Sequence, residues 1–206
     1  MRSLFLLLAT VLVASGAASQ GAVGFKAGLN AADVEVFETV PTGLTESPRI
    51  GGSGGVWARY DVSPTFALQA EALYSQKGTR IGVTGEEAGF VIDIDYVEVP
   101  LVLRVTPAAD PRLRFALYAG GAFAYKVSET VSITSEGETS TNQGDDLFET
   151  NDAGVLAGLE IGSGNVGVDL RYTHGLMDVS VQDEGTTPLT STNGVFTAGL
   201  TFRIGR

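Results

Sequence analysis

The sequence lacks cysteine altogether, which excludes disulfide bonds, thiolate catalysis and cysteine metal sites. It also lacks any run of about 18 apolar residues outside its first segment, so no membrane-spanning helix is expected. We find no phosphate-binding loop, nucleophile elbow or zinc-ligand spacing. Cations are scarce, because 13 Lys and Arg residues accompany 24 Asp and Glu residues for a formal charge of −11. A chain of that charge repels nucleic acid phosphates, which excludes a nucleic acid partner.

The first residues have the pattern of a secretory leader. Arg2 precedes an apolar stretch from Leu4 to Ala14, and small residues follow, which predicts a signal peptide over 1–20 with cleavage near 18–20. Arg2 is the leader's only charged residue, so its removal would leave a charge of −12. The rest, 21–206, shows no shift in composition, so we expect one β-barrel domain there. If this exported chain sits in a membrane, it crosses with strands.

From Ala22 onward, apolar and polar residues alternate with the period of β-strands, and helical periodicity is absent. The alternation predicts eight strands, at 22–31, 50–61, 65–78, 91–105, 113–128, 153–162, 166–177 and 194–204. The links at 61–64, 106–112 and 162–165 are short. They alternate with long links near 32–48, 79–90, 129–152 and 178–193. Short turns at one end and long loops at the other are typical of bacterial transmembrane barrels.

The two faces of these strands also favour a membrane barrel. Glycines are frequent on the polar face, which suits the crowded interior of a narrow barrel. Aromatic residues lie on the apolar face towards the strand ends, as in the girdles of membrane barrels; they are Tyr60, Phe66, Tyr74, Phe123, Tyr125 and Phe202. The alternative is a soluble exported barrel whose apolar face points inward and binds an apolar ligand.

Several segments resemble the PorT-like outer-membrane β-barrel family, and with it the small OmpA/OmpX-type barrels. They are Val23-Gly-Phe-Lys-Ala-Gly-Leu-Asn30, Glu71-Ala-Leu-Tyr-Ser-Gln-Lys-Gly78, Tyr96-Val-Glu-Val-Pro-Leu-Val-Leu-Arg104, Leu117-Tyr-Ala-Gly-Gly121 and Arg171-Tyr-Thr-His-Gly-Leu176. The resemblance covers nearly all of the mature chain. It implies an all-β fold, an eight-stranded antiparallel up-and-down transmembrane β-barrel in the outer membrane of a Gram-negative bacterium.

The chain departs from the usual pattern of such barrels at two places. Similar barrels end on an aromatic residue that the assembly machinery reads, whereas here Phe202 is followed by Arg203 and three further residues. Pro100 stands inside an expected strand, where it removes a ladder donor, so we expect a local bulge.

If the apolar face of the strands points outward, the polar face lines the barrel interior. It then brings eight cations and four anions inside. The expected residues are Lys26, Arg59, Glu71, Lys77, Glu98, Arg104, Arg114, Lys126, Glu160, Asp169, Arg171 and Arg203. Charges in so narrow a space must pair or stay hydrated. We interpret them as a structural salt-bridge network, and the alternative is an anion-selective pathway.

Eighteen of the 24 acidic residues are expected outside the barrel wall, at its long-loop end. They are Asp33, Glu35, Glu38, Glu46, Glu86, Glu87, Asp93, Asp95, Glu129, Glu136, Glu138, Asp145, Asp146, Glu149, Asp152, Asp178, Asp183 and Glu184, opposed there only by Arg80. Such loops are usually solvated, and the alternative is contact with divalent cations or a cationic partner. The segment Asn142-Gln-Gly-Asp-Asp146 has suitable oxygens but lacks the ligand spacing of a helix-loop-helix calcium site.

The function that fits these observations is a non-enzymatic structural or surface-interaction role in the cell envelope. A small transport pore is the first alternative. The second is an interfacial lipid-modifying enzyme built on His174, the only histidine, with Asp178 or Ser180 nearby. We expect no cofactor and no metal site. The expected partners are outer-membrane lipid and the assembly machinery, with the barrel a monomer.

Overall fold

The computed structural model describes residues 21–35, 43–83, 88–107, 113–135, 138–143, 150–176 and 192–204. These residues form nine β-strands, and in this part of the chain no helix is long and apolar enough to cross a membrane. The strands are β1 (Gly21–Glu35), β2 (Leu44–Asp61), β3 (Phe66–Val83), β4 (Gly89–Val105), β5 (Arg114–Ser135), β6 (Glu138–Gln143), β7 (Asn151–Ser163), β8 (Val166–Gly175) and β9 (Thr192–Ile204).

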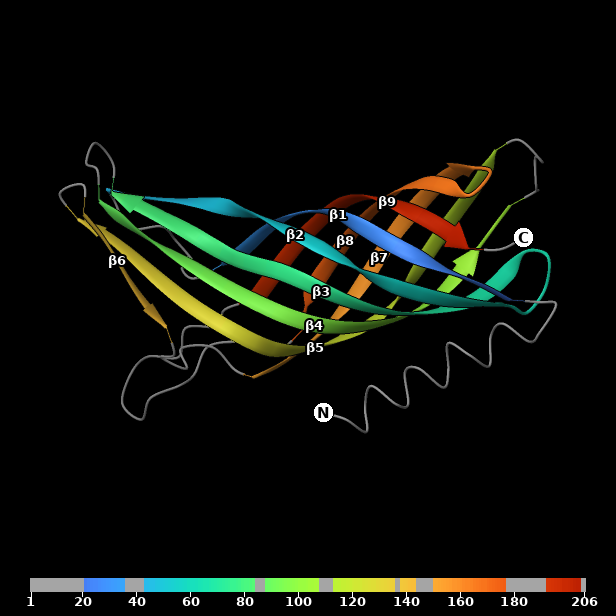
Figure 1. Ribbon diagram of the computed structural model, residues 1–206, viewed down its shortest axis with the longest axis horizontal. Coiled ribbons are helices and arrows are strands. Elements are labelled where there is room, and N and C mark those ends of the chain that lie inside the picture. The colour runs from blue at the N-terminus through green and yellow to red at the C-terminus, as the bar shows by residue number, and fades with distance from the viewer. Residues whose placement is uncertain are drawn as a thin grey trace.

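Antiparallel pairing joins the strands into a closed ring. Each strand from β1 to β5 pairs with the next, β5 pairs with β7, and β7, β8 and β9 follow in order. The ring closes where β9 pairs with β1 over Val23 to Glu35. Figure 1 shows the result, an elongated barrel with the turns between β2 and β3 and between β7 and β8 at one end. The predicted eight-stranded antiparallel up-and-down barrel is confirmed.

The ninth strand, β6, was not predicted. It pairs with the far end of β5, from Thr130 to Ser135, and takes no part in closing the ring. The two form a hairpin that extends one wall beyond the barrel. Its sequence is rich in serine and threonine on both faces, so it has no apolar alternation that would mark a strand.

The outer surface of the ring is apolar. The six aromatic residues expected there are between 42% and 52% exposed, and Leu101 is 61% exposed. Charged and polar side chains point inward instead, including Lys26, Glu71 and Arg171. This is the reverse of a water-soluble protein, so the soluble barrel with an apolar interior is contradicted.

In β3 and β4 the apolar outer surface is a band about nine residues deep, as a bilayer requires. In β3 its outward positions run from Phe66 to Tyr74, and the next outward residue is Gln76. In β4 the band runs from Val105 to Val97, after which Asp95 and Asp93 follow. We call this the outer apolar band.

The strands continue well past the outer apolar band, so the long links are shorter than predicted. The expected loops at 32–48, 79–90 and 129–152 all begin or end in strand. Beyond the band the outward face is polar, as at Gln76 and Asp95, while inward residues such as Ile94 are buried. The lipid-facing apolar pattern therefore stops although the backbone ladder continues. The ion pair between Arg49 and Asp93 lies in this part of the wall, where Arg80 had been expected to be the only cation.

The bulge expected at Pro100 is wrong. The β3–β4 ladder omits Val99 and Pro100, but the register is the same on both sides, with Ala70 opposite Leu101 and Leu73 opposite Glu98. Proline therefore removes a pairing without inserting a residue. The register shifts lie elsewhere, between Pro48 and Ser53 in β2 and between Asp95 and Tyr96 in β4.

Candidate functional site

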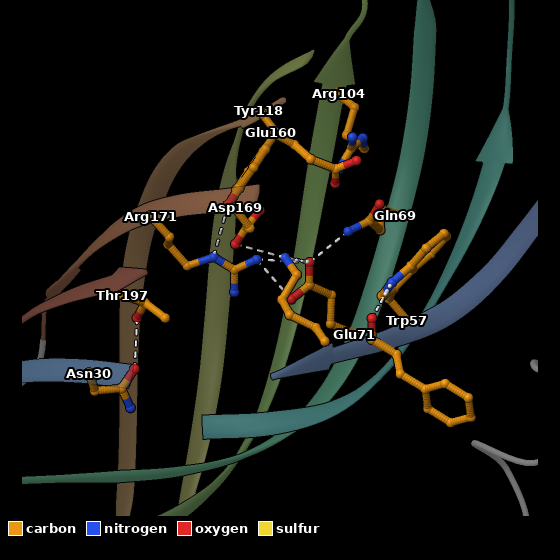
Figure 2. A network of polar contacts seen from close by, with 12 residues as sticks. Asn30, Trp57, Gln69, Glu71, Arg104, Tyr118, Glu160, Asp169, Arg171 and Thr197 are labelled. Carbon is orange, nitrogen blue, oxygen red and sulfur yellow. Dashed lines mark hydrogen bonds and ion pairs between the residues drawn. The ribbon is translucent and has the colours of Figure 1, made fainter. Parts of the chain in front are cut away.

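The barrel interior is the candidate site, and strand alternation determines which side chains enter it. Lys26, Glu71, Tyr118, Asp169 and Arg171 come from β1, β3, β5 and β8, and all are buried. Figure 2 shows Glu71, Tyr118, Asp169 and Arg171 turned toward one another inside the barrel, and Lys26 lies against two of them. We call these five residues the central cluster.

Glu71 receives most of the contacts of the central cluster. Arg171 Nη2 lies 2.8 Å from both carboxylate oxygens of Glu71. Lys26 Nζ lies 3.3 Å from Glu71 Oε1 and 3.0 Å from Asp169 Oδ1. Gln69 Nε2 donates a further hydrogen bond of 2.6 Å to Glu71 Oε1. Two cations thus meet two anions here, and the charges balance.

Tyr118 links the two halves of the central cluster. Its hydroxyl donates to Asp169 Oδ2 at 2.8 Å and accepts from Arg171 Nε at 3.3 Å. Three cations also lie near its ring, with Arg171, Lys26 and Arg104 at 5.3, 5.5 and 5.6 Å from the centroid. These distances are typical of cation–π contacts. The Tyr118 ring therefore stabilises these three cations in addition to the carboxylates.

A second group of charges lies on the long-loop side. Lys77 Nζ is 2.6 Å from Glu98 Oε1 and 3.9 Å from Asp152 Oδ2, and it lies 5.0 Å from the ring centroid of Tyr96. Tyr96 belongs to an apolar cluster with Ile92, Ile94 and Ala124, inside the barrel. A further pair at this level joins Lys126 Nζ to Glu129 Oε2 at 2.6 Å.

A third group lies on the short-turn side. Arg104 Nη1 is 3.1 Å from Glu160 Oε2, and Arg59 Nε is 2.8 Å from Asp61 Oδ1. Arg114 donates to the carbonyl of Gly164 in the β7–β8 turn. Here the cations outnumber the anions.

The structure thus places eleven of the twelve predicted interior residues in these three groups, and the twelfth, Arg203, lies beside Arg59 and Arg114 of the third group. Sequence reasoning missed three anions that join them, Asp61, Glu129 and Asp152. Glu129 and Asp152 were expected outside the wall, and this is wrong, because the longer strands carry both into the interior, where they are buried. Asp93 and Asp95, expected at the long-loop end outside the barrel wall, lie within β4 beyond the outer apolar band.

Sequence reasoning also missed Tyr96 and Tyr118, although their positions carry a signal. Each has the same parity as a charged interior residue of its own strand, Tyr96 with Arg104 and Tyr118 with Arg114. A tyrosine on the polar face of a membrane strand brings a hydroxyl and a cation-binding ring to buried charges.

Little space remains around the central cluster. The cavity bounded by Lys26, Lys77, Asp169 and Arg171 measures about 10 Å³, room for about one water molecule. A much larger cavity of about 460 Å³ opens at the short-turn end, and its wall includes Arg59, Arg104 and Arg114. The interior is therefore filled at the middle and hollow at this end.

Other candidate sites have less support. His174 lies on the exposed outer face of β8, two residues from Tyr172, and the acidic and serine residues considered with it, Asp178 and Ser180, lie outside the described residues. Among the described residues no group of three acidic or histidine side chains could hold a metal ion.

The remaining acidic loop residues are not described in full. Glu38, Glu86, Glu87, Glu136, Asp145, Asp146, Glu149, Asp178, Asp183 and Glu184 lie outside the described residues, as does most of the 142–146 segment considered for calcium.

Gly158 makes room for Tyr118, which yields a prediction. A Cβ at Gly158 would lie 2.5 Å from Tyr118 Cζ and 2.5 Å from the Leu170 carbonyl oxygen. We expect Gly158→Ala to lower the free energy of unfolding by about 1–3 kcal/mol, because the ring cannot move without disturbing the central cluster. Urea unfolding in lipid vesicles measures the change. In the matched control, Gly121→Ala on the outer face, the nearest atom to the new Cβ is 3.7 Å away, and a similar loss there would contradict the explanation.

Comparisons with known proteins agree with this architecture. A family model described as an outer membrane protein beta-barrel domain matches residues 17–181. A search of curated proteins finds no significant match.

Among solved structures, the chain is similar to Ail, the attachment invasion locus protein of Yersinia pestis, with 13% identity over 90% of this chain and 99% of that one and a TM-score of 0.46. For OprG from Pseudomonas aeruginosa the identity is 12%, the coverage 90% and 95%, and the TM-score 0.47. For Neisserial surface protein A the identity is 16% over 88% of this chain and 97% of that one, and the TM-score is 0.45. Because the family model spans most of the sequence, the chain belongs to the outer membrane protein beta-barrel domain family.

Proposed function

We propose that this outer-membrane barrel is a closed, non-enzymatic structural protein that holds its long-loop end above the membrane for surface contacts. The observation that carries this proposal is the filled middle of the barrel. There the central cluster spans the interior from β1 and β3 to β5 and β8, and the remaining cavity measures about 10 Å³.

A conducting pathway would need a continuous column of water through this level. A hydrated ion is larger than one water molecule, so ions cannot pass while Glu71 holds Lys26 and Arg171. Moving these side chains apart would leave buried charges without partners, at a cost of several kcal/mol. The small transport pore is therefore the weaker candidate.

An enzymatic role also has weak support. His174 is exposed on the lipid-facing side of β8. The charged groups of the central cluster pair with one another, as in the contact of Glu71 with Arg171. Paired groups of this kind stabilise a barrel and leave no activated nucleophile.

The same proposal includes the family branch, the leader, the orientation in the membrane and the partners. We place the chain in the PorT-like branch, with residues 1–20 removed as a signal peptide and the short turns in the periplasm. Insertion is by the outer-membrane assembly machinery, which acts on a strand that ends in Phe202-Arg-Ile204. The acidic long-loop end is the surface that meets cationic partners or divalent cations, and the barrel acts as a monomer.

Planar bilayer recording tests the closed barrel. We expect purified, refolded wild-type protein to give no steady single-channel conductance, while a known porin conducts in the same lipid. Heat-dependent gel mobility of the same sample must show a folded barrel. Reproducible conductance steps from the wild type, with an ion preference that changes with salt, would overturn the proposal and favour the pore.

A further inference from the structure

The short-turn end of the barrel interior carries an excess of positive charge. In the described part of the chain, four arginines from four strands share two carboxylates there; they are Arg59, Arg104, Arg114 and Arg203, with Asp61 and Glu160. Arg59 lies close enough to Arg104 and Arg203 to be repelled by both. At the central cluster, by contrast, cations and anions are equal in number. Among the residues that the structure describes, two positive charges therefore remain uncompensated at this level.

These arginines have hydrogen-bonding capacity that the described residues do not use. Arg104 is 3% exposed, and although its Nη1 contacts Glu160, its buried Nε has no hydrogen-bond partner. Arg203 Nε and Thr201 Oγ1 are also buried without a partner, and no ion pair to Arg203 is found within the described part of the chain. Leaving such groups unpaired costs about 1–3 kcal/mol each, so an acceptor that enters here is stabilised.

The same level is hollow. The cavity of about 460 Å³ is bounded by Arg59, Arg104, Arg114 and the β2–β3 turn, including Ser63. A smaller space between Trp57, Thr201 and Arg203 adjoins it, with Arg59, Arg114 and Glu160 in both walls. Sites for small ligands measure about 300–1,000 Å³, so this volume accommodates more than a bare ion. We call the two spaces together the turn-end vestibule.

We propose that the turn-end vestibule binds a phosphate monoester group. Guanidinium groups present forked donors that match phosphate oxygens, and they remain charged at any physiological pH. A phosphate monoester carries about −1.5 to −2 at neutral pH, which offsets the two uncompensated charges. A single carboxylate would offset only one of them. The phosphate belongs either to a soluble molecule or to a lipid headgroup at the mouth of the barrel.

Isothermal titration with inorganic phosphate tests the site in full-length mature protein, refolded in a phosphate-free detergent such as lauryldimethylamine oxide. Titrations run at low ionic strength, and chloride at matched ionic strength controls for screening. We expect Arg203→Gln and Arg114→Gln each to weaken phosphate binding about tenfold or more, because each removes charge-assisted donors. Arg80→Gln removes an exposed cation of β3 beyond the outer apolar band, so we expect no change.

A second arm distinguishes the source of the phosphate. Wild type and Arg203→Gln are placed in nanodiscs that contain phosphatidic acid, and retained lipid is measured by native mass spectrometry. Tight inorganic phosphate binding without lipid retention identifies a soluble ligand. Retention of phosphatidic acid by the wild type that Arg203→Gln loses identifies a headgroup.

Two results would overturn the proposal. One is the absence of both phosphate binding and lipid retention in folded wild type, checked by heat-dependent gel mobility. The other is equal binding by wild type, Arg203→Gln, Arg114→Gln and Arg80→Gln, which would show non-specific attraction. Neither outcome bears on the proposal of a closed barrel, because conductance tests that proposal separately.

Discussion

Replacing Glu71 by alanine is expected to destabilise the barrel more than any other single change to its interior. The substitution leaves Lys26 and Arg171 buried, with Asp169 as the remaining carboxylate near Lys26. Breaking a buried ion pair from one side costs about 3–5 kcal/mol. Urea titration of protein refolded in lipid vesicles measures this loss, with the fluorescence of Trp57 as the signal, because it is the only tryptophan and is 5% exposed in the interior.

Two further variants show whether the loss comes from an uncompensated charge. Glu71→Leu combined with Arg171→Met removes the pair from both sides, and we expect it to recover most of the stability, since apolar replacements of buried pairs are often neutral. Glu138→Gln, on the exposed part of β6, is expected to change stability by less than about 0.5 kcal/mol. If the double variant is as unstable as Glu71→Ala, packing of the carboxylate side chain and not its charge explains the effect.

Leu101→Arg is expected to have the second largest effect on the stability of the barrel. Leu101 is 61% exposed at the middle of the outer apolar band of β4, where we expect lipid chains to surround it. Arginine at a bilayer midplane costs about 2–4 kcal/mol, and near the interface about 0–1 kcal/mol. We therefore expect Leu101→Arg to lower the urea midpoint strongly in lipid vesicles.

Ile133→Arg is the matched control. Ile133 is also a large exposed apolar residue, at 48%, but it lies in the part of β5 that extends beyond the outer apolar band and pairs with β6. We expect its replacement to have little effect. Equal destabilisation by both substitutions would mean that the bilayer does not surround the barrel at the level of Leu101.

The sequence predicted the membrane part of the fold well, because lipid imposes a pattern that residues display directly. Phe66, Leu68 and Tyr74 alternate with Gln69 and Glu71, and this alternation continues for as long as one face meets lipid. It ends at Gln76, so the last residues of β3 and all of β6 were interpreted as loop. Outside the bilayer, strand pairing depends on partners far along the chain, and local sequence does not reveal these partners.

For the interior, sequence parity identified which residues point inward but not how they combine. It placed Lys26 and Arg171 in the lumen, yet their shared contact with Glu71 joins positions 45 and 100 residues apart. The position of the excess positive charge also depends on where the strands end, because Glu129 and Asp152 had been assigned to loops and not to the interior. Once these are counted inside, the surplus of cations among the described residues is confined to the level of Arg59 and Arg203.

The continuation of the strands past the outer apolar band has a further consequence for surface electrostatics. β3 runs on from Tyr74 to Val83, and a strand rises about 3.3 Å per residue with a tilt of about 35–45°, so the wall extends roughly 20 Å beyond the lipid. The screening length at physiological ionic strength is about 8 Å. The described end of the wall, at Val83, therefore stands more than two screening lengths from the anionic headgroups. A carboxylate near that end, such as Glu46 opposite Ile81, is therefore screened from a negatively charged membrane, whereas Asp95 lies close to it.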